Sequence, residues 1–109
     1  MNNSFYFPDI SDVRSAANIL QGIATVTPLE KSINYSKLYD CNVLLKREDL
    51  QIVRSYKIRG AYNKMKSLSA VQLQKGIVCA SAGNHAQGVA YSCKALKGYG
   101  KIFMPSPTP

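Results

Sequence analysis

Apolar side chains recur at helical spacing in three stretches of the chain, and this pattern predicts three amphipathic helices. Side chains at positions i, i+3, i+4 and i+7 share one face of a helix, so each stretch presents an apolar face for packing. The three stripes are Val13, Ala16, Ala17 and Leu20; Ile58, Ala61, Tyr62 and Met65; and Ala86, Val89, Ala90 and Cys93. We expect Ser11 to cap the first helix and Gly22 to end it. Gly98 and Gly100 are expected to end the third helix.

Three short apolar runs have the length of β-strands, namely residues 43–46, 77–80 and 101–104. The run 77–80 is apolar throughout, which predicts a strand that is buried on both faces. With the helix that follows it and the run 101–104, it makes the strand–helix–strand unit of a parallel sheet. The pattern therefore predicts an α/β fold in which helices flank a parallel sheet.

Two further segments connect these elements. Thr27-Pro28 breaks the helical pattern and begins an irregular stretch, because the residue before a proline is disfavoured in the helical conformation. Ser69 and Gln72 have the spacing of a capping box, which predicts a short helix that ends at Gly76.

The chain has 109 residues and a formal net charge of +8, which makes nucleic-acid binding one hypothesis. Its basic residues are scattered, however, and Lys46 and Arg47 are followed directly by Glu48 and Asp49. The basic and aromatic motif typical of RNA-binding domains does not occur. A solvated basic surface is the better interpretation, and we expect no nucleic-acid partner.

The three cysteines, Cys41, Cys79 and Cys93, are widely spaced along the chain. This spacing favours neither a disulfide framework nor a metal site, and we expect Cys79 and Cys93 to be buried free thiols. Residues 1–8 lack the basic and apolar stretches of a signal peptide, and no apolar run is long enough to span a membrane. We therefore expect a cytoplasmic protein without a membrane partner.

A lysine at the start of the second helix is the first candidate for chemistry. Lys57 lies in the run 55–61 (SYKIRGA), with Arg54 and Arg59 close to it in sequence. Neighbouring positive charge and a helix N-terminus favour the free amine, which can form an imine with an aldehyde cofactor. Tyr56 offers a ring face on which an aromatic cofactor can stack. The alternative, which spacing alone favours, is an ordinary exposed lysine.

The second candidate is the run 81–88 (SAGNHAQG), where a strand ends and a helix begins. Free N–H groups at such a turn form a site for an anion, and the helix dipole favours negative charge there. Small side chains let a carboxylate approach the backbone, and the Asn84 amide suits a phenolic oxygen or an oxyanion. Ser81 or Asn84 as a simple helix cap explains the run equally well.

Several common active sites are disfavoured by the sequence. His85 is the only histidine, and no second ligand stands at a spacing that suits zinc. The chain lacks the G-x-S-x-G run of serine hydrolases, the G-x-G-x-x-G run of dinucleotide-binding folds and the Walker pattern. A nucleotide function is therefore disfavoured.

Taken together, three runs resemble the threonine dehydratases (threonine ammonia-lyases), a group of pyridoxal-phosphate enzymes with the fold of the tryptophan synthase β-subunit. The runs are 46–51 (KREDLQ), 55–64 (SYKIRGAYNK) and 80–90 (ASAGNHAQGVA), in this order. The run 27–29 (TPL) upstream and the proline-rich residues 104–109 also match. The resemblance covers nearly the whole chain and implies the type II fold of pyridoxal-phosphate enzymes, incomplete in these residues.

The resemblance implies a role for each candidate residue. Lys57 would hold pyridoxal 5'-phosphate as an imine and, once freed, remove the Cα proton of the substrate. Asn84 would bind the phenolic oxygen of the cofactor, and Tyr56 would keep a stacking face where relatives commonly carry phenylalanine. The loop residues that would bind the substrate carboxylate are Ser81, Ala82, Gly83, Asn84 and His85.

The implied reaction is the deamination of L-threonine, and also of L-serine, by β-elimination of water, as in isoleucine biosynthesis or threonine catabolism. The products are 2-oxobutanoate or pyruvate, and ammonia. Serine racemase-like relatives are the alternative, but they carry a second serine in the loop as an acid/base, where this chain has Ala82. Because a methyl group cannot transfer a proton, elimination is favoured over racemisation.

We interpret residues 1–109 as the N-terminal part of the catalytic domain, with no boundary inside. In the family the glycine-rich loop that holds the cofactor phosphate comes later, so we expect these residues alone to be inactive. A non-catalytic truncated remnant is the alternative. The resemblance also implies that full-length relatives are homo-oligomers that bind a small amino-acid substrate, and it leaves the biosynthetic and catabolic forms unseparated.

Overall fold

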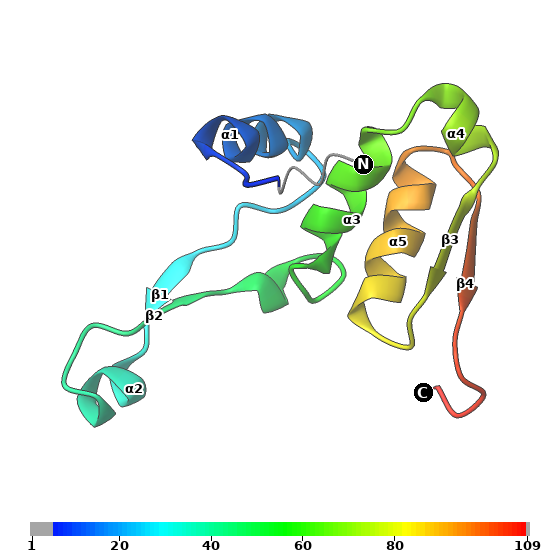
Figure 1. Cartoon of the computed structure of the whole chain (residues 1–109). Coiled ribbons are helices and arrows are strands. Elements are labelled where there is room, and N and C mark those ends of the chain that lie inside the picture. Colours follow the sequence, from blue (N-terminus) through cyan, green and yellow to red (C-terminus); the bar gives the residue numbers. More distant parts are fainter. Residues whose placement is uncertain (1–5, 109) are drawn as a thin grey trace.

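The computed structural model describes residues 6–108 and shows an open arrangement of helices and two small sheets (Figure 1). Outside the described residues lie Pro109 and residues 1–5. The latter belong to the segment 1–8, in which no signal peptide is expected. The helices are α1 (Ile10–Ile19), α2 (Ile33–Leu38), α3 (Lys57–Lys66), α4 (Ala70–Gln74) and α5 (Asn84–Ala95), with a 3-10 turn, η1 (Glu48–Leu50). The strands are β1 (Leu29–Lys31), β2 (Leu44–Lys46), β3 (Ile77–Ala80) and β4 (Gly100–Phe103).

The predicted strand–helix–strand unit is present. Strands β3 and β4 pair in parallel, from Ile77 opposite Gly100 to Ala80 opposite Phe103, and α5 connects them. The strand predicted near residues 43–46 exists as β2, but it pairs antiparallel with β1 in a separate sheet. The α/β class with a parallel sheet and flanking helices is therefore confirmed.

The core lies around α5, which packs between α3 and one face of the β3–β4 sheet. Its buried members are Ala61, Met65, Val89 and Cys93, and the apolar side chains packed against them are Leu73, Ile77, Cys79, Leu96 and Ile102. All four residues of the α3 stripe are buried, as predicted. On α5 the stripe is right except for Ala90, which is exposed.

The first helix is capped by a different residue from the one that we expected. The Asp9 carboxylate accepts hydrogen bonds from the backbone N–H groups of Ser11, at 2.7 Å, and of Asp12, at 3.1 Å. Asp12 in turn accepts from the Asp9 N–H, which completes a capping box. Ser11 is therefore not the cap. Gly22, just after the helix, has the left-handed conformation expected there, with φ of 72°.

The ends of α4 and α5 agree with the sequence to different degrees. The Ser69 hydroxyl accepts from the Gln72 N–H, the Gln72 side chain accepts from the Ser69 N–H, and Gly76 follows with φ of 88°, so the predicted box is confirmed. Gly98 lies just beyond α5 and donates its N–H to Cys93 O at 2.9 Å. Gly100, by contrast, is the first residue of β4 rather than a helix end.

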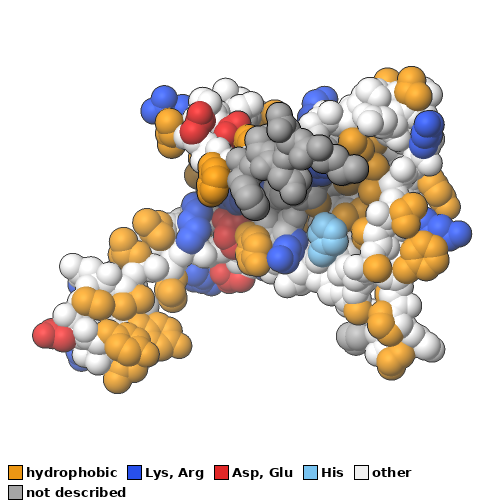
Figure 2. Space-filling view, in the orientation of Figure 1, with side chains coloured by type: hydrophobic (Ala, Val, Ile, Leu, Met, Phe, Trp, Pro, Cys, Tyr) orange, Lys and Arg blue, Asp and Glu red, His pale blue; other side chains and the backbone are white. Residues whose placement is uncertain are grey.

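The stretch predicted to be irregular holds a strand and a helix. Strands β1 and β2 and helix α2 form a lobe, residues 29–46, that projects from the rest of the chain in Figure 1. Apolar side chains gather on its surface in Figure 2; the exposed ones are Leu29, Ile33, Tyr35, Leu38, Tyr39, Leu44 and Leu45. Strand β1 and helix α2, of three and six residues, are too short to give a periodic signal, which is why the pattern missed these two elements.

Strand β3 is covered on one face only, so the prediction of burial on both faces is wrong. Val78 is 69% exposed and Phe103, on the same face of β4, is 54% exposed. The open form also appears in the accessible surface, which is 8489 Å² where a compact protein of this mass has roughly 6,000 Å². The apolar run 77–80 therefore places apolar side chains on a face of the β3–β4 sheet that the described residues do not cover.

The cysteines are all free thiols. Cys93 is buried as predicted, Cys79 is only half-buried and Cys41 is exposed. Within the described part of the chain, no helix is long and apolar enough to cross a membrane.

Candidate active site

The two sequence runs that carry candidate chemistry lie against each other in space. Helices α3 and α5 run side by side and begin at the same end of the molecule (Figure 1). Gly88 makes this contact close, because a Cβ placed on it would lie 3.1 Å from the carbonyl carbon of Lys57 and 3.2 Å from its oxygen. The fold therefore places the first turns of α5 against the backbone of Lys57.

Lys57 is the first residue of α3 and is half-buried. Its Nζ lies 4.6 Å from the centroid of the Tyr56 ring, in the geometry of a cation–π contact, and that ring is 59% exposed. Among the described residues, no carboxylate lies within ion-pair distance of the amine. The amine is thus held over an aromatic face without a competing anion.

The loop before α5 is partly capped and partly open. Gly83 occupies the N-cap position, and the Ser81 hydroxyl accepts from the N–H groups of Gly83 and Ala86, each at 3.3 Å, so Ser81 satisfies one N–H of the first helical turn. In the described chain, the N–H groups of Asn84 and His85 have no hydrogen-bond partner, and their side chains are exposed. These two donors, at a helix N-terminus, are the groups that an anion would bind.

The loop also leaves space in front of its backbone. A Cβ placed on Gly83 would meet nothing within 4 Å, so the fold itself does not require a glycine there. A hollow lies beside the loop at the carboxyl ends of β3 and β4, where ligands of α/β folds commonly bind. Its lining residues are Ala80, Ser81, Ala82, Phe103, Met104 and Pro105.

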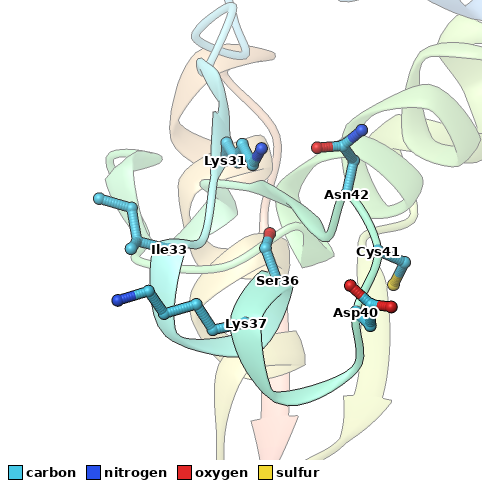
Figure 3. Close-up of a pocket in the computed structure, with 7 residues that line it drawn as sticks. All are labelled: Lys31, Ile33, Ser36, Lys37, Asp40, Cys41 and Asn42. Carbon is cyan, nitrogen blue, oxygen red and sulfur yellow. The ribbon is translucent and has the colours of Figure 1, made fainter.

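A second hollow lies in the lobe and contains none of the candidate residues (Figure 3). Its side chains come from β1, α2 and the turn after α2; they are Lys31, Ile33, Ser36, Lys37, Asp40, Cys41 and Asn42. Because the lobe projects away from α3 and α5, this hollow is separate from the candidate site.

Sequence reasoning missed a polar network beside the lysine. Arg59 donates from Nε and from one terminal nitrogen to Glu48, at 2.8 and 2.7 Å. Thr27 donates its hydroxyl to the same carboxylate at 2.6 Å, and the Gln51 amide donates at 3.2 Å. Arg59, expected to add positive charge near Lys57, is therefore paired with a carboxylate. Glu48 and Arg59 are eleven positions apart on different elements, so no local sequence pattern indicates their contact.

Gln51 extends the network to the segment before β1. Its side chain is almost wholly buried, and its amide accepts from Thr25 N at 2.9 Å and donates to Thr25 O at 2.8 Å. These bonds satisfy the backbone of a segment that has no strand partner at that point. The network thus ties residues 25–27 and η1 to the first turn of α3.

The Glu48 network predicts that stability depends on pH. The hydrogen bond from Arg59, supported by that from Thr27, lowers the pKa of Glu48 to about 2 from an ordinary value of 4.5. Because the folded pKa is the lower one, this stabilisation is complete above pH 4.5 and is lost as the pH falls towards 2. We expect a loss of up to about 3 kcal/mol between pH 5 and pH 2.

Urea unfolding at several pH values measures this effect. The Glu48 side chain is only 15% exposed, so screening by water removes little of it. Glu48→Gln should be less stable at pH 6 and should show a flatter decline on acidification. Parallel declines in the two proteins would show that other carboxyl groups cause the pH dependence.

Known proteins resemble the chain over most of its length. The family model of pyridoxal-phosphate dependent enzymes matches residues 20–109. The biosynthetic L-threonine dehydratase of Bacillus subtilis is 56% identical over 100 residues, which is 92% of this chain and 24% of the relative. That of Mycobacterium tuberculosis is 50% identical over 99 residues, 91% of this chain and 23% of the relative. The chain thus spans about a quarter of the length of these curated relatives.

Solved structures show the same likeness. Threonine deaminase isoform 2 of Solanum lycopersicum, in its processed form, superposes with a TM-score of 0.76 at 43% identity, covering 94% of this chain and 30% of that one. Maize serine racemase superposes with a TM-score of 0.88 at 32% identity, covering 95% of this chain and 32% of that one. Sequence identity is thus higher with the deaminase, and backbone similarity is higher with the racemase.

Proposed function

Because this chain belongs to the family of pyridoxal-phosphate dependent enzymes, we propose that it serves the deamination of L-threonine, with L-serine as a second substrate. The observation that supports the proposal is the close contact between α5, at Gly88, and the backbone of Lys57, since it brings the two candidate runs together. The names of the relatives at 50–56% identity support the choice of reaction. Since the chain spans a quarter of those relatives, the activity is proposed for the protein at the length that its gene encodes.

The residues present fit the aldehyde end and the ring of the cofactor. The Lys57 amine has no carboxylate partner among the described residues, the Tyr56 ring is exposed beside it, and the Asn84 amide is exposed on the loop. We propose that these three residues hold pyridoxal phosphate. When bound, the cofactor supplies an electron sink for the carbanion that forms at the substrate Cα.

The remaining roles fall to the lysine and the loop. The N–H groups of Asn84 and His85 bind the substrate carboxylate and so orient the amino acid. Lys57 accepts the Cα proton at its amine nitrogen. The β-hydroxyl then leaves as water, and hydrolysis returns one water and releases ammonia. L-Threonine thus gives one 2-oxobutanoate and one ammonia, and L-serine gives one pyruvate and one ammonia.

Serine racemisation is the second candidate function, because the backbone of maize serine racemase superposes with the higher TM-score. Racemisation needs a proton donor on the face of the substrate opposite the lysine. The loop residue that would supply it in the racemases is Ala82 here, and a methyl group has no proton to give. The chemistry of this position therefore favours elimination.

One assay separates the two functions. The protein, expressed at its natural length and supplied with pyridoxal phosphate, is given L-threonine or L-serine, and oxoacid, ammonia and D-serine are measured. We expect oxoacid and ammonia in equal amounts and D-serine at less than about a tenth of the pyruvate. Ala82→Ser should raise the share of D-serine. D-Serine in excess of pyruvate would favour the racemase, and no product of either kind would contradict both functions.

A further inference from the structure

We propose that Glu48 is a positioning residue, which acts through Arg59 to fix the first turn of α3 and with it the Lys57 amine. This inference rests on the proposed function, in which Lys57 reacts with pyridoxal phosphate. It concerns a residue that makes no contact with the amine itself.

The start of α3 packs against Gly88 of α5, but few directed hydrogen bonds hold it in place. Tyr56 occupies the N-cap position and makes no side-chain hydrogen bond to the helix. Among the residues that the structure describes, the Lys57 N–H donates to one side chain only, Ser55 Oγ, at a long 3.4 Å. Ile58 is completely buried, but apolar burial has no direction and leaves a helix free to roll slightly.

The Arg59–Glu48 pair fixes the orientation of α3 about its axis. Arg59 stands two residues after Lys57 in the same helical turn, and its guanidinium donates two hydrogen bonds to one carboxylate. Two-pronged pairs of this kind fix orientation as well as distance. A roll of α3 about its axis would break one of the two bonds, and it would also move the Lys57 side chain.

Glu48 can act as an anchor because it is itself held. Its carboxylate accepts from Thr27 and Gln51 as well as from Arg59, and the side chains of Thr27 and Gln51 are almost wholly buried. Gln51 is fixed in turn by two bonds to the Thr25 backbone. The position of the carboxylate is therefore set by segments on both sides of β1 and β2, and not by α3.

The test follows the rate at which Lys57 becomes covalently attached to pyridoxal phosphate. The parent protein and Glu48→Gln, both at natural length, are mixed with the cofactor at a temperature at which circular dichroism shows both to be folded. Samples are trapped with borohydride at timed intervals, and peptide mapping identifies the labelled lysines. Lys64, exposed on the same helix, gives an internal reference for ordinary lysine reactivity.

We expect Glu48→Gln to slow the labelling of Lys57 about tenfold and to leave that of Lys64 unchanged, because a small misplacement of a reacting group costs a large factor in rate. Glu30→Gln is the matched control, since Glu30 is an exposed carboxylate that pairs with Arg47 at 2.8 Å. In Glu30→Gln, Lys57 and Lys64 should be labelled at the same rates as in the parent. A role in stability alone would lower the unfolding midpoint of Glu48→Gln without changing the ratio of Lys57 to Lys64 labelling.

A double-mutant cycle tests whether Glu48 acts through Arg59. Arg59→Gln should slow the labelling of Lys57 as much as Glu48→Gln does. In the double variant the labelling should be no slower than in either single variant. Additive losses would overturn the proposal. If Glu48→Gln does not fold, Arg59→Lys makes the same comparison, because it keeps the charge and loses the two-pronged geometry.

The two hypotheses fail in different ways. A parent protein that shows no preference for Lys57 over Lys64 would contradict the proposed function, and the positioning role with it. A parent that labels Lys57 selectively, with unchanged selectivity in folded Glu48→Gln and in Arg59→Lys, would overturn the positioning role alone.

Discussion

Replacing Lys57 by alanine is expected to abolish the deamination of L-threonine, with a fall in kcat of at least about 10³-fold. The substitution removes the amine that holds the cofactor and also the base that accepts the Cα proton, so two contributions vanish together. Alanine favours helix formation at this position, and the lysine makes no ion pair with the described residues. The loss should therefore come from chemistry and not from unfolding.

The measurement combines turnover with trapping. Absorbance of the protein with pyridoxal phosphate, followed by borohydride treatment and peptide mapping, should place the label on Lys57 in the parent and leave it dispersed in Lys57→Ala. Lys64→Ala, which removes an exposed lysine from the last turn of the same helix, should match the parent in both respects. Turnover near the parent rate in Lys57→Ala would refute the role of the lysine, whatever the labelling shows.

Sequence patterns predicted the elements whose packing is regular. The α3 stripe identified all four residues that the helix buries, because α3 packs against α5 with one continuous face. The Ser69 capping box was equally readable, since both of its partners lie within one turn. The two runs of candidate residues were visible because each joins unusual residue types at the start of a helix.

What the pattern missed depends on contacts between distant segments. The antiparallel pairing of β1 with β2 and the Glu48–Arg59 pair join separate elements, and neither has a local signal. The exposure of Val78 was missed for another reason. An apolar strand predicts that both faces of the sheet are covered, but the strand sequence does not show which residues cover each face.

A larger side chain at Gly88 is expected to give the strongest loss of stability among single changes near the site. The Cβ of valine would lie 3.1 to 3.3 Å from three backbone atoms of Lys57 and Ile58, and its branches would come closer still. Those atoms cannot give way easily, because Ile58 is fully buried and Arg59 is held by Glu48. We expect Gly88→Val to lower the free energy of unfolding by about 3 kcal/mol.

Gly60 provides the matched comparison for the smaller substitution. It also lies inside a helix, and a Cβ added to it would meet nothing within 4 Å. Alanine at Gly60 should therefore stabilise the protein by up to about 1 kcal/mol through helix propensity alone. Alanine at Gly88 gains the same propensity but meets the Lys57 backbone, and we expect a net loss of about 1 kcal/mol. Urea unfolding of the parent and the three variants measures these differences.

The effect at Gly88 should also reach the chemistry, because the only way to relieve the overlap is to move α5 away from α3. This movement would shift the N-terminal end of α5, with the N–H groups of Asn84 and His85, relative to Lys57. Gly88→Val, studied at a temperature at which it is folded, should therefore lose threonine deamination while Gly60→Ala keeps it. If Gly88→Val were as stable and as active as the parent, the close approach of the two helices would not be what assembles the site. The glycine, which is costly within a helix, would then need another explanation. The close contact accounts for it directly, because a residue without a side chain lets α5 lie against the Lys57 backbone without crowding.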